Sequence, residues 1–152
     1  MLKITIPLEP RTKKNSQKII WHNKRPLIVP SDQYTEYEKN CGWFLPKGRK
    51  IDRPVNVQCV FYMKTKRKCD LTNLLEAIDD ILVKHDVLTD DNYNIIAAHD
   101  GSRVYIDRDH PRTEIIIEEI RQGNEQEINR ASEADAEHTS AAVRSTKNHC
   151  DV

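Results

Sequence analysis

Four short segments of the chain are predicted to be strands, and in two of them apolar and polar side chains alternate, which predicts one buried face. Residues 2–7 form the first of these segments, and residues 55–63 form the most regular one. Residues 93–99 and 113–120 complete the set. The apolar side chains that share one face of the most regular segment are Val55, Val57, Cys59, Phe61 and Met63.

Two further segments carry apolar residues every three or four positions, which predicts amphipathic helices. The stronger one begins after Asp70, which lies where an N-cap or first-turn acid is expected. Its apolar positions are Leu71, Leu74, Leu75, Ile78, Ile81 and Leu82. The other begins at Ser31 or Asp32 and is expected to end before Pro46 and Gly48. Its apolar positions are Tyr34, Tyr37, Cys41, Phe44 and Leu45.

The remaining segments lack a clear period. Residues 10–25 are basic and polar with a short apolar centre, which fits a loop or a hairpin closed near Asn23. In the second case residues 27–29 form the returning strand. Large apolar residues nearly vanish after residue 120, so residues 1–120 are predicted to form the domain and residues 121–152 a polar, disordered tail. The elements predict an α+β fold of two layers, with a small mixed sheet and two main helices on one face.

The charge of the chain changes sign along its length. The 152 residues carry 24 Lys and Arg against 24 Asp and Glu, so the formal net charge is zero. Residues 1–68 hold 16 cations and 5 acids, whereas residues 69–120 hold 4 and 13. A basic half followed by an acidic half favours a site for a polyanion beside a site for a cation.

Composition excludes several classes of protein. No apolar run approaches the roughly 18 residues of a membrane-spanning helix, and the N-terminus lacks the layout of a signal peptide. The four cysteines form no Cys-x-x-Cys pair, and the six histidines add no zinc-finger spacing. These features predict a cytoplasmic protein with reduced thiols.

Three acids lie at the two ends of the stronger helix. Asp70 precedes it, and Asp90 and Asp91 lie in the turn that follows it. A strand after the helix that pairs with the strand before it is expected to bring Asp91 towards Asp70. Clustered carboxylates repel one another unless a cation joins them, and Mg²⁺ or Mn²⁺ prefers such oxygen ligands. Ordinary helix capping and turn chemistry account for the same residues without a metal.

Cationic segments adjoin these acids. Residues 64–68 have the sequence KTKRK and lead directly into Asp70, and a second basic cluster is formed by Arg11, Lys13, Lys14 and Lys18. A run of charge is usually only a solvated surface. Two such runs beside carboxylates are what a metal-dependent enzyme acting on a phosphodiester needs, because cations hold the backbone and the metal activates water.

The run KTKRKCDLTNLLEAIDDILVKHDVLTDDNYNI resembles the core of the RusA family of Holliday junction resolvases. That family is marked by Asp-x-Asp-Asn opening an amphipathic helix, a Lys three residues after the Asn, and an Asp-Asp pair after the helix. Asp70 and Asn73 match the first motif, and Asp90 and Asp91 match the pair. The segments PRTKKNSQK and TEIIIEEI also fit, so the resemblance covers about residues 1–120 and implies a RusA-like fold.

Two positions depart from the family pattern. Thr72 stands where the family usually has its second catalytic Asp, and Glu76 stands where it usually has the Lys. One hypothesis is that Glu76 supplies the missing carboxylate, but on an ideal helix it points about 240° away from Asp70. We therefore favour Asp90 as the acid that joins Asp91.

The resemblance implies a homodimeric endodeoxyribonuclease that uses Mg²⁺, with Mn²⁺ as its substitute, to make paired nicks across a four-way DNA junction. Asp70 and Asp91, assisted by Asp90, are then the expected catalytic and metal-binding residues. The residues expected to hold DNA phosphates are Lys13, Lys14, Lys66, Arg67 and Lys68. Two alternatives remain: a DNA-binding protein that has lost catalysis, which Thr72 and Glu76 favour, and a small globular protein without a nucleic-acid role.

Overall fold

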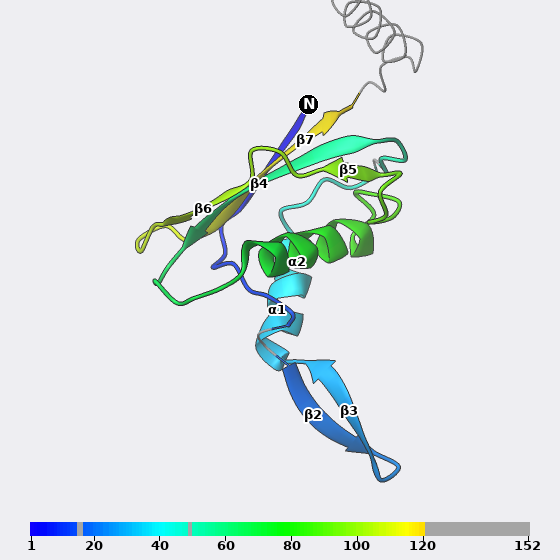
Figure 1. The fold of residues 1–152 in the computed structure, drawn as a ribbon, viewed down its shortest axis with the longest axis vertical. Coiled ribbons are helices and arrows are strands. Elements are labelled where there is room, and N and C mark those ends of the chain that lie inside the picture. Colours follow the sequence, from blue (N-terminus) through cyan, green and yellow to red (C-terminus); the bar gives the residue numbers. More distant parts are fainter. Residues whose placement is uncertain (15–16, 49, 121–152) are drawn as a thin grey trace, which may run out of the picture. The chain divides into compact units, whose positions relative to one another are not determined.

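The fold is an open mixed sheet with helices against one side (Figure 1). A computed structural model describes residues 1–14, 17–48 and 50–120. The tail predicted for residues 121–152, and its boundary at residue 120, lie outside the described residues and stay predictions. The elements, in chain order, are β1 (Leu2–Ile6), β2 (Gln17–His22), β3 (Arg25–Pro30), α1 (Asp32–Cys41), β4 (Val55–Met63), α2 (Leu71–Lys84), β5 (Ile96–Ala98), β6 (Arg103–Ile106) and β7 (Arg112–Glu119).

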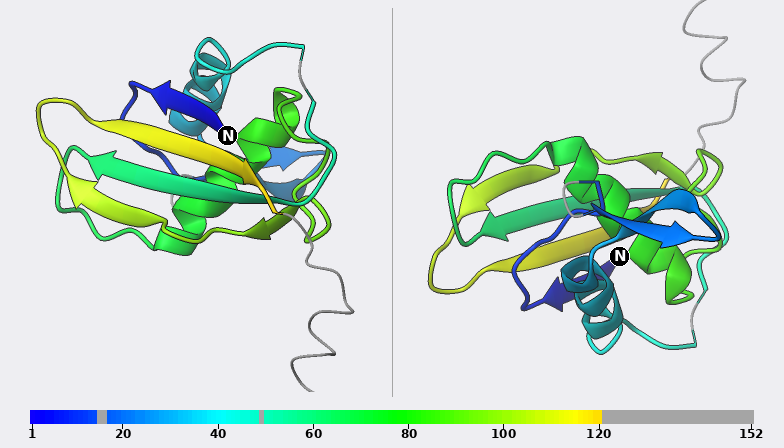
Figure 2. Two further views of the ribbon diagram at one scale, coloured as in Figure 1. Left: turned by 90° about the horizontal axis from the view of Figure 1, so that it is seen from above. Right: turned by 90° about the horizontal axis from the view of Figure 1, so that it is seen from below.

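Strand β4 organises the main sheet. It pairs antiparallel with β7, which in turn pairs antiparallel with the edge strand β1. On its other side β4 pairs in parallel with β5 near its start and with β6 near its end. Helices α1 and α2 lie on the same face of this sheet (Figure 2). The arrangement confirms the predicted α+β fold with two layers.

The core lies between β4 and α2. Every second residue of β4 is buried, from Val55 to Met63, as the alternation of its sequence predicts. From α2, the apolar stripe buries Leu74, Ile78, Ile81 and Leu82 against the sheet. Each such side chain contributes about 1.5–3 kcal/mol on leaving water, so this contact fixes where both ends of α2 lie. Neither described helix is long and apolar enough to cross a membrane.

The segment after α2 differs from its prediction. One strand was expected over residues 93–99, but the structure has the three-residue β5 and then β6, separated by a turn in which Gly101 has a φ of 81°. The sequence gives no periodic signal for β6, because all four of its residues are exposed. Pairing with β4, from Val60 opposite Arg103 to Met63 opposite Ile106, makes it a strand.

Helix α1 is shorter than its apolar spacing predicts. Its start is as expected, because Ser31 is the N-cap and its Oγ accepts a hydrogen bond from the Tyr34 amide at 3.2 Å. The helix ends at Cys41 instead of continuing to residue 45. The next amides bond only three residues back, as in Phe44 N to Cys41 O at 3.0 Å, which tightens the chain out of the α-helical path.

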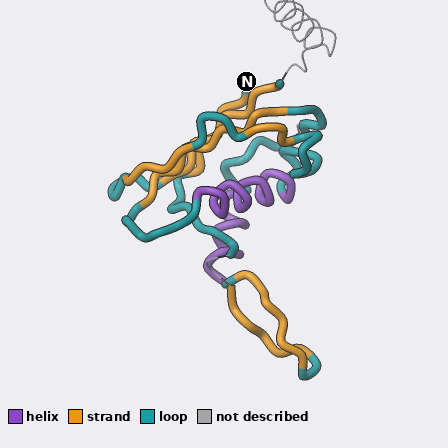
Figure 3. The backbone as a smooth tube through the Cα atoms, viewed as in Figure 1, coloured by secondary structure: helices purple, strands orange, loops and turns teal. Residues whose placement is uncertain are grey.

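Residues 17–30 form a separate two-stranded sheet, the β2–β3 arm, which extends away from the helical layer (Figure 3). Its turn consists of Asn23 and Lys24, with φ values of 48° and 62°. Positive φ at both central residues is the requirement of a type I′ hairpin turn, and Asn tolerates it better than most residues. The hairpin predicted to close near Asn23 is therefore confirmed.

Candidate metal ligands and nucleic-acid interface

Asp70 stands at the N-terminus of α2 with a carboxylate that the helix does not use. Its backbone is extended, with φ −76° and ψ 134°, and its side chain makes no capping bond to a helix amide. One oxygen, Oδ2, accepts a hydrogen bond from Asn73 Nδ2 at 3.3 Å. The residue is exposed, so this carboxylate can take a cation or an incoming ligand.

Asp90 and Asp91 are in direct contact in the turn after the C-terminal end of α2. The Asp90 carboxylate accepts from the Asp91 amide and from Asn92 Nδ2, both at 2.7 Å, and these bonds hold its pKa below the usual range. The pKa of Asp91 is raised, first by partial burial and then by its contact with Asp90. Adjacent carboxylates resist carrying two charges at once, and a bound divalent cation relieves that repulsion.

The expectation that Asp91 approaches Asp70 is wrong within one chain. Strands β5 and β6 do pair with β4, but in parallel, so the residues before β5 lie near the start of β4. Asp70 instead follows the end of β4, and the 14 residues of α2 separate the two ends by about 21 Å. In the described ranges, no three His, Cys, Asp or Glu side chains gather closely enough to hold a metal ion. Within the described residues, a single chain therefore does not bring Asp70, Asp90 and Asp91 together in one cluster.

The basic loop of residues 64–68 lies beside Asp70. Arg67 and Lys68, together with Arg11, line a cavity of about 240 Å³ between this loop and residues 9–12. Arg11 pairs with Glu9 at 2.8 Å. Lys66, Arg67 and Lys68 are exposed, and no carboxylate from the described part of the chain pairs with them. The structure thus brings three of the five predicted phosphate-binding residues to the Asp70 end of α2.

The other two predicted phosphate-binding residues have protein partners. Lys13 Nζ lies 2.9 Å from Asp80 Oδ2, and Lys14 Nζ lies 2.6 Å from Glu76 Oε2. The bond to Asp80 raises the pKa of Lys13. These pairs hold the N-terminal segment across the polar face of α2, and Lys14 offsets the acid at position 76. Both lysines keep about half of their side-chain surface exposed, so an approaching phosphate can still reach them.

A charged pair that the sequence analysis missed joins α2 to the sheet. His99 Nδ1 lies 2.8 Å from the carbonyl oxygen of Val57, and His99 Nε2 lies 3.1 Å from Asp79 Oδ2. Both neighbouring oxygens can accept a hydrogen bond, which favours the doubly protonated imidazole. The Asp79 bond accordingly raises the pKa of His99. The sequence does carry one signal for this pair. Asp79 follows Leu75 by one helical turn, so it flanks the apolar stripe of the helix.

Burial of Asp79 outweighs its charged neighbour. Its pKa is raised by desolvation, although His99 acts to lower it. The second oxygen, Oδ1, is buried without a hydrogen-bond partner among the described residues. The Asp79 side chain is only 13% exposed, so water solvates its charge poorly. The Asp79–His99 pair is therefore a structural contact between α2 and the sheet.

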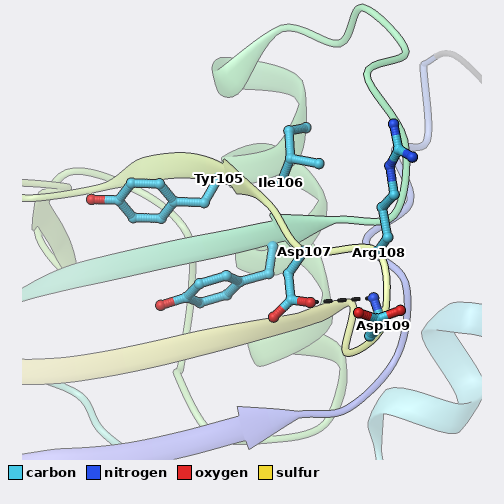
Figure 4. A pocket seen from close by; sticks show the side chains of 6 residues that line it. Tyr105, Ile106, Asp107, Arg108 and Asp109 are labelled. Atoms are coloured by element: carbon cyan, nitrogen blue, oxygen red, sulfur yellow. Dashed lines mark hydrogen bonds between the residues drawn. The ribbon is translucent and has the colours of Figure 1, made fainter.

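A second depression, of about 780 Å³, lies at the β6–β7 turn (Figure 4). The rings of Tyr62 and Tyr105 lie 5.7 Å apart there, and the Arg112 guanidinium lies 3.5 Å from the Tyr62 centroid. Asp107 and Asp109 also line it. Hydrogen bonds, first from the His110 amide, lower the pKa of Asp107 and keep it charged. These two acids outnumber Arg108, the one cation of the lining, so we exclude the depression from the candidate site.

An α+β domain that presents an unpartnered cationic loop beside an exposed carboxylate has the arrangement of a phosphodiester-binding protein. Comparison with known protein families identifies the family to which the chain belongs. The family model of endodeoxyribonuclease RusA matches residues 7–118, and the chain belongs to this family. The resemblance noted in the sequence is therefore confirmed, and membership implies an endonuclease that acts on Holliday junctions. No curated protein matches the chain.

Proposed function

We propose that this protein is a Mg²⁺-dependent endonuclease that resolves four-way DNA junctions by paired nicks. The observation that carries the proposal is the exposed Asp70 carboxylate next to the cations of residues 64–68. Arg67 and Lys68 hold the DNA backbone, with Lys13, Lys14 and Lys66 adding contacts to phosphate. Asp70, Asp91 and Asp90 would hold the metal, which when bound would supply an activated water and offset charge on the reacting phosphate. Mn²⁺ is expected to replace Mg²⁺.

The separation of Asp70 from Asp91 supports a homodimer with shared sites. A two-fold axis that brings the Asp70 end of α2 in one chain to the Asp90–Asp91 end in the other creates two equivalent sites at once. Each site then combines Asp70 of one chain with Asp91 of the partner subunit. Two sites related by a two-fold axis match the two strands that a resolvase must cut.

The alternative of a junction-binding protein without catalysis rests on two residues. Thr72 lies in the first turn of α2, exposed, and offers a neutral hydroxyl where a second carboxylate is usual. Glu76 is held by Lys14 and lies on another side of the helix from Asp70. The proposed enzyme is accordingly expected to bind its metal weakly.

The proposal is tested with a synthetic four-way junction and strand-specific labels, in Mg²⁺, Mn²⁺ or EDTA. The wild-type protein should nick the junction only with a metal present. Asp70→Asn and Asp91→Asn should each keep junction binding and lose cleavage by about 100-fold or more, because each removes a charged ligand. Undiminished cutting by Asp70→Asn would remove that residue from the site, and junction binding without any metal-dependent cutting favours the non-catalytic alternative.

Mixing the two inactive variants tests whether two chains share a site. A heterodimer of Asp70→Asn with Asp91→Asn keeps one intact combination of acids, so nicking of one strand should return. Random assortment places about half of the dimers in this state. A mixture as inactive as its parents, from a wild type that cuts, would show that the ligands belong to one chain.

A further inference from the structure

The β2–β3 arm exposes large apolar side chains to an unusual degree. Ile19, Trp21 and Ile28 are 66%, 73% and 67% exposed, and Ile20 and Leu27 are 40% and 45% exposed. The arm has only two strands, and neither pairs with the main sheet. An isolated two-stranded hairpin is marginal in water, so this one is expected to gain stability from a further contact.

The strand register sorts the side chains of the arm into two faces. Ile19 lies opposite Ile28, and Trp21 lies opposite Pro26. Residues directly opposite in an antiparallel pair point to the same face, so these four side chains form one continuous apolar face. We call it the Trp21 face.

The opposite face is mixed, because Lys18 and Arg25 lie on it together with Ile20, which is opposite Leu27. The cations of the paired strands are thus absent from the Trp21 face. Lys18 also pairs with Asp32 at 2.6 Å, at the base of the arm. DNA bound by these cations leaves the Trp21 face in water, whereas an apolar partner covers it. The partner that fits is therefore a protein surface.

We propose that the Trp21 face is covered by a second copy of this chain, which makes the arm the dimerisation element. This inference rests on the homodimer of the proposed function. Each of the four exposed apolar side chains of the Trp21 face can bury on the order of 100 Å², or about 400 Å² for one arm. Two reciprocal arms and the surfaces they cover then total roughly 1,600 Å², the size of a standard specific interface.

The chain also carries apolar surface that can receive an arm. Trp43, which follows α1, is 76% exposed, and Phe44 is 41% exposed. A chain that holds both a projecting apolar arm and an apolar patch can close a two-fold dimer, because each copy supplies both halves of the contact.

Trp21 provides a direct reporter, because the chain has only two tryptophans. Trp43→Phe keeps an aromatic ring in the receiving surface and leaves Trp21 as the only indole in the full-length protein. Its emission is recorded over a range of protein concentrations in parallel with sedimentation. We expect the emission to move to shorter wavelength in step with dimer formation, since the indole leaves water.

A pair of variants tests the energetic role of the face. Ile19→Asp with Ile28→Asp should weaken the dimer at least 100-fold, because it places charge in an apolar contact. Val104→Asp is the matched control, because Val104 is 40% exposed on a strand of the main sheet, and it should leave the dimer intact. No residue of the arm belongs to the core, so thermal unfolding of the domain should persist in the double variant.

The outcomes separate this inference from the proposed function. A chain that stays monomeric at every concentration overturns both the dimer and the role of the arm. A dimer that survives the Ile19→Asp/Ile28→Asp change, or that forms while Trp21 still emits as in water, overturns the role of the arm alone. An emission shift that appears only on adding junction DNA assigns the face to DNA and equally overturns the inference.

Discussion

His99 shows how a single residue couples the folded state to pH. The bond to Asp79 raises the pKa of His99, so the folded chain binds the imidazole proton more tightly than the unfolded chain. The stabilisation is complete below the unfolded value of about 6.5 and is lost as pH rises through the raised value. The pKa of Asp79 is raised by burial, which also makes stability fall with rising pH, in a more acidic range.

We predict that the free energy of unfolding falls as pH rises across the neutral range, and that His99→Gln removes most of this dependence. Urea unfolding of both proteins between about pH 5.5 and 8.5 measures it. His110→Gln is the control, since His110 is an exposed histidine in the β6–β7 turn. A wild type whose stability does not change over this range would contradict a protonated His99.

At the scale of elements, the C-terminal ends of α1 and α2 lie in close contact, since Gly42 follows one and His85 the other. A Cβ added at Gly42 would lie 2.4 Å from His85 Cε1, closer than such atoms can approach. The ring cannot move freely, because His85 Nε2 is hydrogen-bonded to the Glu38 carbonyl oxygen at 3.0 Å. A glycine at this position therefore lets the two helices approach one another.

Gly42→Ala is predicted to cost about 1–3 kcal/mol of unfolding free energy, because the added methyl group overpacks the contact. Combining it with His85→Ala should cost less than the sum of the two single changes, since the smaller side chain makes room. Denaturant unfolding of the four proteins gives the coupling energy. Strictly additive losses would show that the ring does not limit position 42. Gly48→Ala is a partial control, because nothing lies within 4 Å of its added Cβ but its φ of 78° gives a cost in backbone strain without overpacking.

At the scale of the whole molecule, the fold converts the charge split of the sequence into two ends. Arg67 and its neighbours stand beside Asp70 after β4, whereas Asp90 and Asp91 lie near the start of that strand. Part of the basic half is already offset by acids of α2, through Lys13 and Lys14. The free cations of the 64–68 loop should therefore dominate the response of DNA binding to salt.

Arg67→Ala is predicted to weaken junction binding and to lower the slope of log affinity against log salt by about one, as the loss of one phosphate contact requires. Binding titrations at several salt concentrations measure the slope. Arg53→Ala is the matched control, because Arg53 pairs with Glu119 near the start of β4, far from the loop. An unchanged slope in Arg67→Ala would count against its contact with phosphate.

The sequence by itself determined the elements whose signal is local. Alternation located β1 and β4, the apolar stripe located α2, and the family motif identified Asp70 as its first residue. These signals work because the side-chain period of a helix or strand is a property of one segment. The exposed strand β6 and the early end of α1 lacked such a signal. Pairing with β4 makes β6 a strand, and after Cys41 the amides bond only three residues back.

Only the tertiary structure decided which charged groups meet. Because β4 and β5 are parallel, α2 must run back along the sheet, and this places Asp70 and Asp91 at opposite ends of one helix. The same packing places Lys14 on Glu76 and joins Asp79 to His99. Contacts between residues far apart in sequence depend on the direction of each connection, which local periodicity does not encode.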